Sequence, residues 1–267
     1  ARNSSTVGYG DLNRRLLKIG AFTYVLHSHL PYCRQAGRWP HGEEWLHEAA
    51  SETYIPLLDD LHQMKETGCR YKLTIGITPV LAEQLADPLV LQHMEEFIQE
   101  KIRRANNDIQ RFQASKEIHL ESLARFYRDK YQHILTCFQQ KFNRDIIGGF
   151  RNLQDEGYVE IATSAATHGY LPLFERDSSV YAQLKTGVET YRRHFGRAPR
   201  SLWLPECAYR TGFYTSSDGN TYVKPGLEAF LYDMGISCFF AETHTVEGGE
   251  PVGKAKGEAI GPYGNIP

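Results

Sequence analysis

The sequence of 267 residues lacks three features that would place it in a class at once. It has no run of 18 apolar residues, so no membrane-spanning helix is predicted. Its five cysteines are scattered and contain no C-x-x-C pair, unlike a disulfide framework or a zinc knuckle. The formal net charge is only −2, without the basic stripe typical of nucleic-acid-binding proteins. We therefore expect no membrane partner, no nucleic-acid partner, and free thiols in a reducing, cytoplasmic compartment.

Apolar residues are plentiful, at 41% of the chain, which is enough to form a sizeable core. Aromatic residues make up 12%, a composition compatible with carbohydrate binding through ring faces but also common in cores. Residues 1–19 lack the apolar segment of a secretory signal. We expect them to be a disordered lead-in, with a remnant of an organelle targeting sequence as the alternative.

Short apolar runs alternate with helical patterns along the rest of the chain. Such alternation predicts an α/β fold of parallel strands joined by crossover helices. The helical stretch over about 89–142 is too long for one crossover and predicts a helical insertion, and Pro56 is expected to break or kink the first helix. Strands are predicted over 22–30, 71–78, 158–163, 201–206 and 236–242, and helices over 43–66, 89–113, 117–142, 145–156, 179–195 and 225–235.

Histidine and glutamate side chains follow four of the five predicted strands. In parallel α/β folds the functional residues gather at the carboxyl ends of the strands, so we expect these side chains to lie close together. Scattered placement would not give this clustering. The residues concerned are His27 and His29, His168, Glu206, and Glu242 with His244.

His27 and His29 are two residues apart on a strand, so both imidazoles point to the same face. This geometry is typical of a metal site that needs one or two further ligands. It is equally typical of a hydrogen-bonding wall for a polar substrate. A third interpretation is a pair of structural histidines bonded to backbone, and the spacing alone leaves all three open.

Glu206 stands in the apolar stretch SLWLPECAYR (201–210). A carboxylate buried in such surroundings is costly unless its charge is used or paired. It is therefore either a nucleophile or general base at a strand end, or a buried acid paired with an arginine such as Arg210. Trp45, at the start of a helix, is more typical of a core residue. Glu160, inside the third predicted strand, is expected to point inward with a structural role.

Three segments occur in a specific order, namely HSHLPY (27–32), GYVEIATSAATHGYLP (157–172) and WLPECAYR (203–210). Together they resemble three motifs of glycoside hydrolase family 57, in the form found in its α-1,4-glucan branching enzymes. The resemblance runs from about residue 20 to the end. It implies an incomplete (β/α)7 barrel with a helical region, of which 20–267 would be the N-terminal part.

The resemblance also implies roles for individual residues. Glu206 would be the nucleophile of a retaining transglycosylation that makes α-1,6 branches in a glycogen-type polymer. The α-1,4-glucan would serve as donor and acceptor. The family needs no metal or cofactor, so none is expected. The implied substrate-binding residues are His27, His29, Trp45, His168, Tyr209 and Arg210.

The sequence departs from the family pattern after Glu206. The family's general acid is an aspartate in a later motif, which is not found here, and Glu242 does not match that motif. We therefore expect a portion of a branching enzyme that binds glucan weakly by itself and lacks the full reaction. The alternatives are a 4-α-glucanotransferase or α-amylase of the same family, a metal-dependent polysaccharide deacetylase using His27 and His29, and a non-catalytic glucan-binding protein.

Overall fold

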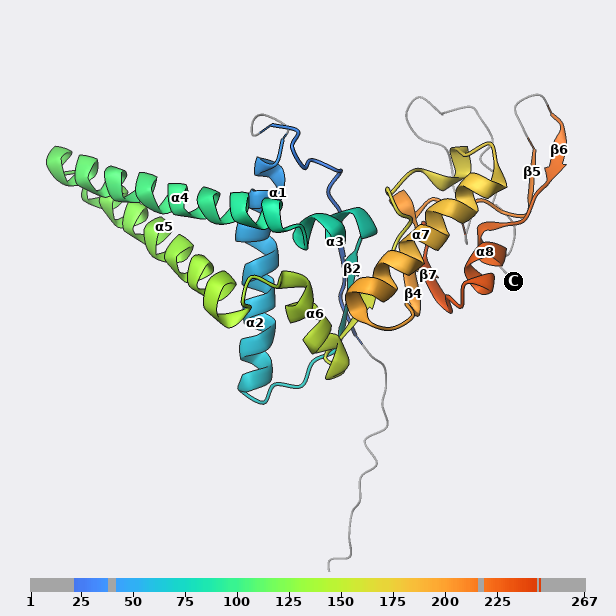
Figure 1. The fold of residues 1–267 in the computed structure, drawn as a ribbon, viewed down its shortest axis with the longest axis horizontal. Helices are drawn as coiled ribbons and strands as arrows, with labels where there is room; N and C mark the ends of the chain where they lie inside the picture. The colour runs from blue at the N-terminus through green and yellow to red at the C-terminus, as the bar shows by residue number, and fades with distance from the viewer. Residues whose placement is uncertain (1–21, 38–41, 216–218, 244, 246–267) are drawn as a thin grey trace, which may run out of the picture.

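The fold is built on five parallel strands (Figure 1). The computed structural model describes residues 22–37, 42–215, 219–243 and 245. All five predicted strands are confirmed, with shorter bounds. They are β1 (Val25–Ser28), β2 (Leu73–Ile77), β3 (Val159–Ala162), β4 (Ser201–Trp203) and β7 (Cys238–Phe240). The lead-in predicted for 1–19 lies outside the described residues.

The strands follow one another in chain order. The first sheet runs β1-β2-β3 and the second β4-β7, all parallel. A parallel bridge between Thr163 and Leu202 joins the two sheets. Each strand therefore neighbours the next, as in a (β/α) barrel, and the order does not reverse as it does in a doubly wound sheet.

Helices cover the strands and form most of the core. The first predicted helix is continuous in space but has three parts, α1 (Glu44–Ala49), the π-helix η1 (Ala50–Tyr54) and α2 (Ile55–Glu66). Pro56 does not break it, and the five residues from Ala50 to Tyr54, which end two positions before this proline, are wound as the π-helix. The remaining crossover helices are α6 (Ile146–Asp155), α7 (Asp177–Phe195) and α8 (Leu227–Asp233).

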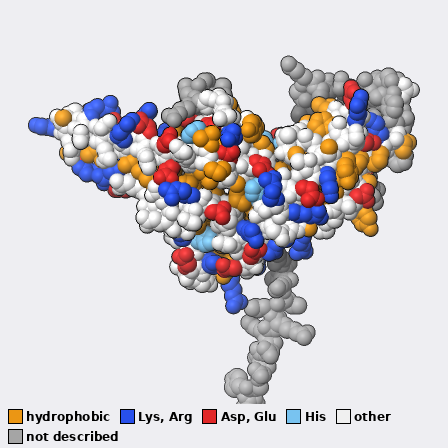
Figure 2. All heavy atoms as spheres, in the orientation of Figure 1, with side chains coloured by type: hydrophobic (Ala, Val, Ile, Leu, Met, Phe, Trp, Pro, Cys, Tyr) orange, Lys and Arg blue, Asp and Glu red, His pale blue; other side chains and the backbone are white. Residues whose placement is uncertain are grey.

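The predicted insertion is a long helical hairpin that projects away from the strands (Figure 1). It consists of α4 (Pro88–Ser115) and α5 (Ile118–Thr136), and α5 continues as the π-helix η2 (Cys137–Lys141). Asp87 caps α4 by accepting hydrogen bonds from the N–H groups of Leu89 and Val90. Figure 2 shows acidic and basic side chains interspersed over this face of the molecule.

Two buried clusters hold the parts together. One packs β2 and β3 against the helices α1–α6 and includes the fully buried rings of Phe138 and Phe150. The other joins β4 and β7 with α7 and α8 through Leu184, Leu202 and Leu231. Each fully buried side chain of this size contributes about 1.5–3 kcal/mol.

Three further elements were not predicted from the sequence. They are the short helix α3 (Pro79–Leu85) and an antiparallel pair of strands, β5 (Phe213–Thr215) and β6 (Thr221–Val223). All five cysteines are free, as expected. Among the described residues, no helix combines the length and the hydropathy needed to cross a bilayer.

Candidate active site

Three histidines form a tight cluster at the carboxyl end of β1. His27 and His29 come from the end of that strand, and His168 comes from the loop after β3. His27 Nε2 lies 3.1 Å from His168 Nε2, and the His29 ring stacks on the His168 ring with centroids 4.0 Å apart. His29 Nδ1 is also within 3.2 Å of the Thr78 hydroxyl, which follows β2. The strand ends thus bring His27, His29 and His168 together as predicted, and the hydrogen-bonded ring nitrogens of His27 and His29 face side chains.

The neighbouring strand makes room for His27. Gly76 on β2 is its register partner, and a Cβ at Gly76 would lie 3.0 Å from His27 Nδ1. On its other side the His27 ring stacks on Trp203, the last residue of β4, with centroids 4.6 Å apart. A Cβ at position 76 would require the imidazole to shift by a few tenths of an ångström.

Glu206 is presented to solvent by the turn after β4. The turn η4 (Pro205–Cys207) places Glu206 at φ 55° and Cys207 at φ 54°, in the left-handed region. The Glu206 side chain is 70% exposed, so the expectation of a buried carboxylate is wrong. Its Oε1 lies 3.8 Å from Nδ1 of His168, whose side chain is only 4% exposed.

Arg210 is not the partner of Glu206. Its guanidinium donates to Asp177 Oδ1 at 2.8 Å and to the Pro225 carbonyl at 3.0 Å. The interpretation of Glu206 as an acid paired with Arg210 is therefore wrong, and the carboxylate is left facing the histidine cluster.

Burial keeps the histidine cluster neutral. Burial, with a smaller contribution from the neighbouring histidines, lowers the pKa of both His27 and His168 to about 4. His27 Nδ1 is buried and has no hydrogen-bond partner among the described residues. A buried lone pair without a partner costs less than a buried N–H, so we place the His27 proton on Nε2, donated to His168. His168 then carries its proton on Nδ1, the atom that faces Glu206.

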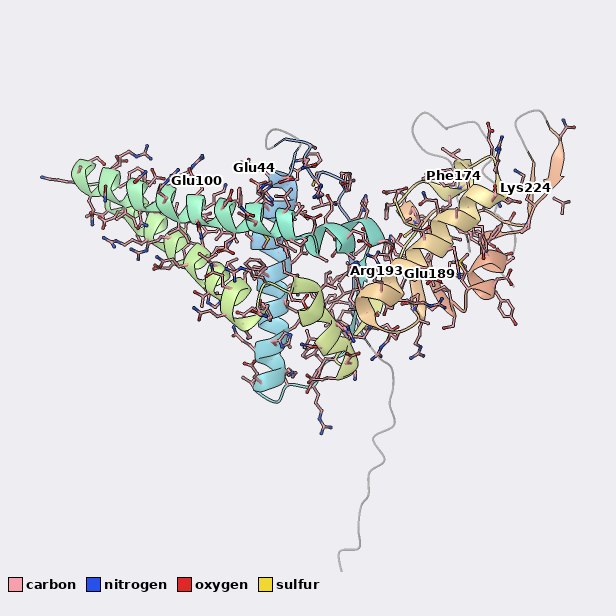
Figure 3. The ribbon with its side chains drawn as sticks, viewed as in Figure 1. Glu44, Glu100, Phe174, Glu189, Arg193 and Lys224 are labelled. Atoms are coloured by element: carbon pink, nitrogen blue, oxygen red, sulfur yellow. The ribbon has the colours of Figure 1, made fainter. Side chains whose placement is uncertain are left out.

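A hollow of about 580 Å³ opens beside Glu206. The aromatic rings of Tyr170 and Phe174 line it together with the charged groups of Glu175 and Lys224. Phe174 and Lys224 lie at the same end of the molecule (Figure 3), and they line the hollow with Glu206 and Glu242, which follow β4 and β7. A site that combines aromatic ring faces with charged groups is suited to a ligand that has both apolar faces and polar groups, such as a sugar.

The other predicted site residues are spread more widely. Tyr209 and Arg210 line the hollow but are mostly buried, and the Tyr209 hydroxyl donates to Glu228. Trp45 is 40% exposed and lines a separate hollow with Leu30 and Glu48. These positions fit a supporting role for Tyr209 and Arg210 and leave Trp45 apart from the cluster.

Two weaker candidates can also be placed. Glu242 lines the hollow beside Glu206, whereas His244 lies outside the described residues. The register of β1, β2 and β3 puts Glu160 on the same face as His27, in line with its predicted inward orientation.

The sequence analysis missed Trp203, Gly76 and Phe174. Trp203 could have been found, because it ends its strand three residues before Glu206. The roles of Gly76 and Phe174 depend on strand register and loop packing, which no motif signals.

Within the described residues, neither His27 nor His29 belongs to a set of three potential metal ligands. Asp59, His133 and Cys137 do form such a set, between α2 and α5.

The sequence matches the family model for Glycosyl hydrolase family 57 over residues 23–259. It is 42% identical over 242 residues to the 1,4-alpha-glucan branching enzyme TK1436 of Thermococcus kodakarensis, covering 90% of this chain. The chain spans only about a third of that relative, 35% of its length.

Two solved structures are similar to the fold. The GH57-type branching enzyme of Pyrococcus horikoshii superposes with a TM-score of 0.78 and 46% identity, over 84% of this chain and 42% of that one. The α-amylase AmyC of Thermotoga maritima superposes with a TM-score of 0.71 and 31% identity, over 84% of this chain and 40% of that one.

Proposed function

The chain belongs to glycosyl hydrolase family 57, and from this membership we propose that it carries the nucleophile of an α-1,4-glucan branching enzyme. The observation that carries the proposal is the exposed Glu206 carboxylate, held 3.8 Å from the neutral histidine cluster. The similarity to TK1436 supports this activity over the others considered.

In the proposed reaction Glu206 attacks the anomeric carbon of an α-1,4-glucan. The glycosidic bond breaks, the leaving oxygen takes a proton from a second carboxyl group, and a glycosyl-enzyme ester forms. The 6-hydroxyl of another glucan unit then attacks the same carbon, gives its proton to that second group and releases Glu206. This retaining route requires carboxyl groups about 5–5.5 Å apart.

The two carboxyl groups must differ in protonation state. Glu206 is exposed to solvent, so its carboxylate does not incur the cost of a buried charge. The neutral His168 directs its Nδ1–H toward the Glu206 carboxylate and places no full charge beside it. We expect the acid to be an aspartate supplied by the region of the relatives that this chain does not span.

The strand order supports a barrel for the complete catalytic domain. We propose the incomplete (β/α)7 barrel implied by the family, in which 20–267 contributes the five parallel strands and the hairpin α4–α5 is the insertion. We further propose a cytoplasmic role in the synthesis of a glycogen-type polymer, and the five free thiols fit a reducing compartment.

The test compares Glu206→Gln with Glu242→Gln in a polypeptide of the relatives' full length that contains this chain. Both carboxylates line the same hollow. We expect Glu206→Gln to lower the rate of α-1,6 linkage formation by more than about 10³-fold and Glu242→Gln to leave a substantial rate. Loss of activity only in Glu242→Gln would overturn the assignment.

An α-amylase is the second candidate, because AmyC shares the fold. The two activities differ in the acceptor, which is a glucan hydroxyl in branching and water in hydrolysis. Proton NMR of the product from amylose separates them. New α-1,6 linkages without new reducing ends indicate branching, and new reducing ends alone indicate hydrolysis.

A further inference from the structure

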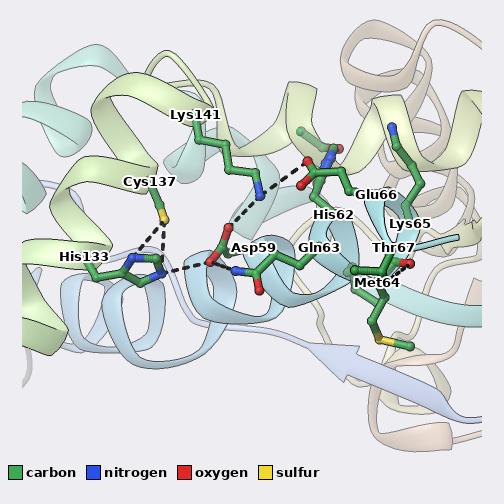
Figure 4. A network of polar contacts seen from close by, with 12 residues as sticks. Asp59, His62, Gln63, Met64, Lys65, Glu66, Thr67, His133, Cys137 and Lys141 are labelled. Carbon is green, nitrogen blue, oxygen red and sulfur yellow. Dashed lines mark hydrogen bonds and ion pairs between the residues drawn. The ribbon is translucent and has the colours of Figure 1, made fainter. Parts of the chain in front are cut away.

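A cluster of potential metal ligands lies far along the chain from the active-site residues, between α2 and the end of α5 (Figure 4). Asp59 Oδ2 lies 2.9 Å from His133 Nε2, and Cys137 Sγ lies 3.4 Å from the same nitrogen. The three ligand atoms all fall within 4.8 Å of one another. One carboxylate, one imidazole and one thiol thus converge on a single point.

The backbone at this point is unusual. His133 and Cys137 are one turn apart on the same helix face, and the π-helix η2 begins at Cys137. Single π-helical turns inside α-helices are frequently found at functional sites. This widened turn places Lys141 next to Asp59 as well, with Nζ donating to Oδ1 at 2.8 Å.

The cluster is closed on one side and open on the other. Side chains of Asp59 and Cys137 are buried, whereas His133 is 58% exposed. Lys141 occupies Oδ1 of Asp59 and leaves Oδ2 to face His133. An ion could therefore enter past His133 and retain one solvent-facing coordination position.

We propose that Asp59, His133 and Cys137 bind a zinc ion that ties α2 to the end of α5. A thiolate, an imidazole and a carboxylate form a typical zinc ligand set. Tetrahedral zinc with bonds of ~2.0–2.3 Å requires ligand atoms roughly 3.3–3.7 Å apart. The Cys137–His133 separation already meets this, and the Asp59–His133 separation needs widening by about 0.4 Å.

The protonation states also change when the ion binds. Burial, with Asp59 close by, raises the pKa of Cys137 to about 11, so the thiol is protonated without the ion. Zinc binds the thiolate, so loading releases the Cys137 proton to solvent. His133 must offer Nε2 without its hydrogen, and Gln63 must turn its amide away from Asp59 Oδ2.

A network without an ion would need only the two basic partners of Asp59. Lys141 and His133 suffice to offset one buried carboxylate, and Cys137 adds nothing to that charge balance. Under the zinc proposal all three ligands contribute to affinity. This difference makes Cys137 the most informative position to change.

The test titrates zinc chloride into the purified chain by calorimetry and counts bound zinc by native mass spectrometry. Wild type should bind one equivalent, with proton release seen as a dependence of the heat on buffer ionisation, and its melting temperature should rise. Cys137→Ser and His133→Ala should each lose at least about tenfold in affinity and lose the thermal shift.

Matched controls are available on α5 and in the loop after α2. His119→Ala changes an exposed histidine at the other end of α5, and Cys69→Ser changes an exposed cysteine. Both should bind zinc as wild type does. The exposed His133 and the near-isosteric Cys137→Ser change should leave the fold intact by circular dichroism. Absence of stoichiometric binding, or equal affinity in Cys137→Ser and wild type, would overturn the proposal.

Discussion

Glu206, Cys207 and His168 all adopt left-handed backbone conformations, at φ 55°, 54° and 57°. For residues with a Cβ this costs about 1–2 kcal/mol each. Such outliers persist where the surroundings hold them, and they cluster at active sites. Here they aim the carboxylate and the imidazole at each other from two different loops.

The strain at Glu206 predicts a gain in stability when function is removed. Asparagine tolerates the left-handed region better than glutamate does, whereas glutamine does not. We expect Glu206→Asn to raise the free energy of unfolding by about 0.5–1 kcal/mol and Glu206→Gln to leave it unchanged. Urea unfolding measures both, and equal stabilities for the two variants would show that the turn stores no strain.

The neutral histidines predict a pH dependence of stability. Unfolded histidine titrates near its ordinary value of 6.5, whereas folded His27 and His168 titrate near 4. Between these values the unfolded chain binds more protons, so stability rises with pH and is lost as the pH falls from 6.5 toward 4. Partial exposure of His27 reduces the size of its contribution.

Thermal unfolding from pH 6.5 to 5.5 checks this dependence above the range where ordinary carboxylates titrate. His168→Gln keeps a polar side chain but cannot titrate, so the slope of stability against pH should become shallower. An unchanged slope in His168→Gln would mean that other groups account for the acid sensitivity.

The helix α7 depends on a close approach to the backbone that follows β3. A Cβ at Gly187 would lie 2.1 Å from the Ser164 carbonyl oxygen, and backbone cannot move aside cheaply. We expect Gly187→Ala to destabilise the protein by about 1–3 kcal/mol despite the higher helix propensity of alanine. Thr186→Ala, at the adjacent exposed position, should change stability by less than about 0.5 kcal/mol. Chemical denaturation compares the two.

At the level of elements, the hydrophobic pattern predicted those helices and strands whose signal lies within their own sequence. The 3–4 spacing predicted the long helices α4 and α5, and apolar runs predicted all five parallel strands. The β5–β6 pair was missed because its strands, FYT and TYV, are not part of longer apolar runs such as those that contain the equally short β4 and β7. The helix α3 was not predicted, although Pro79, which directly follows the predicted strand 71–78, suits a first helical turn.

The site could be predicted in part for the same reason. Strand ends are readable from sequence, so His27, His29, His168 and Glu206 were expected together. What could not be read is burial and pairing. Glu206 proved exposed because its turn points it outward, and Arg210 proved to pair with Asp177 on α7, far along the chain.

At the scale of the molecule, the segment that leads into β1, the edge strand of its sheet, is poorly covered. Phe22 and Tyr24, just before and leading into β1, are 81% and 65% exposed. The family barrel would continue the sheet, and the chain spans only 35% of TK1436. This fits the proposal that the second carboxyl group comes from the region of the relatives that this chain does not span. In that proposal this chain contributes the nucleophile, the histidine cluster and the hollow beside Glu206.

Trapping the glycosyl-enzyme tests the central claim most directly. A fluorinated glucosyl donor slows the second step of a retaining enzyme, so the ester accumulates and can be located by peptide mass spectrometry. In a polypeptide of the relatives' full length that contains this chain, we predict one label per chain on Glu206, within SLWLPECAYR. A label on Glu242, or no label in a preparation that actively forms branches, would contradict the account.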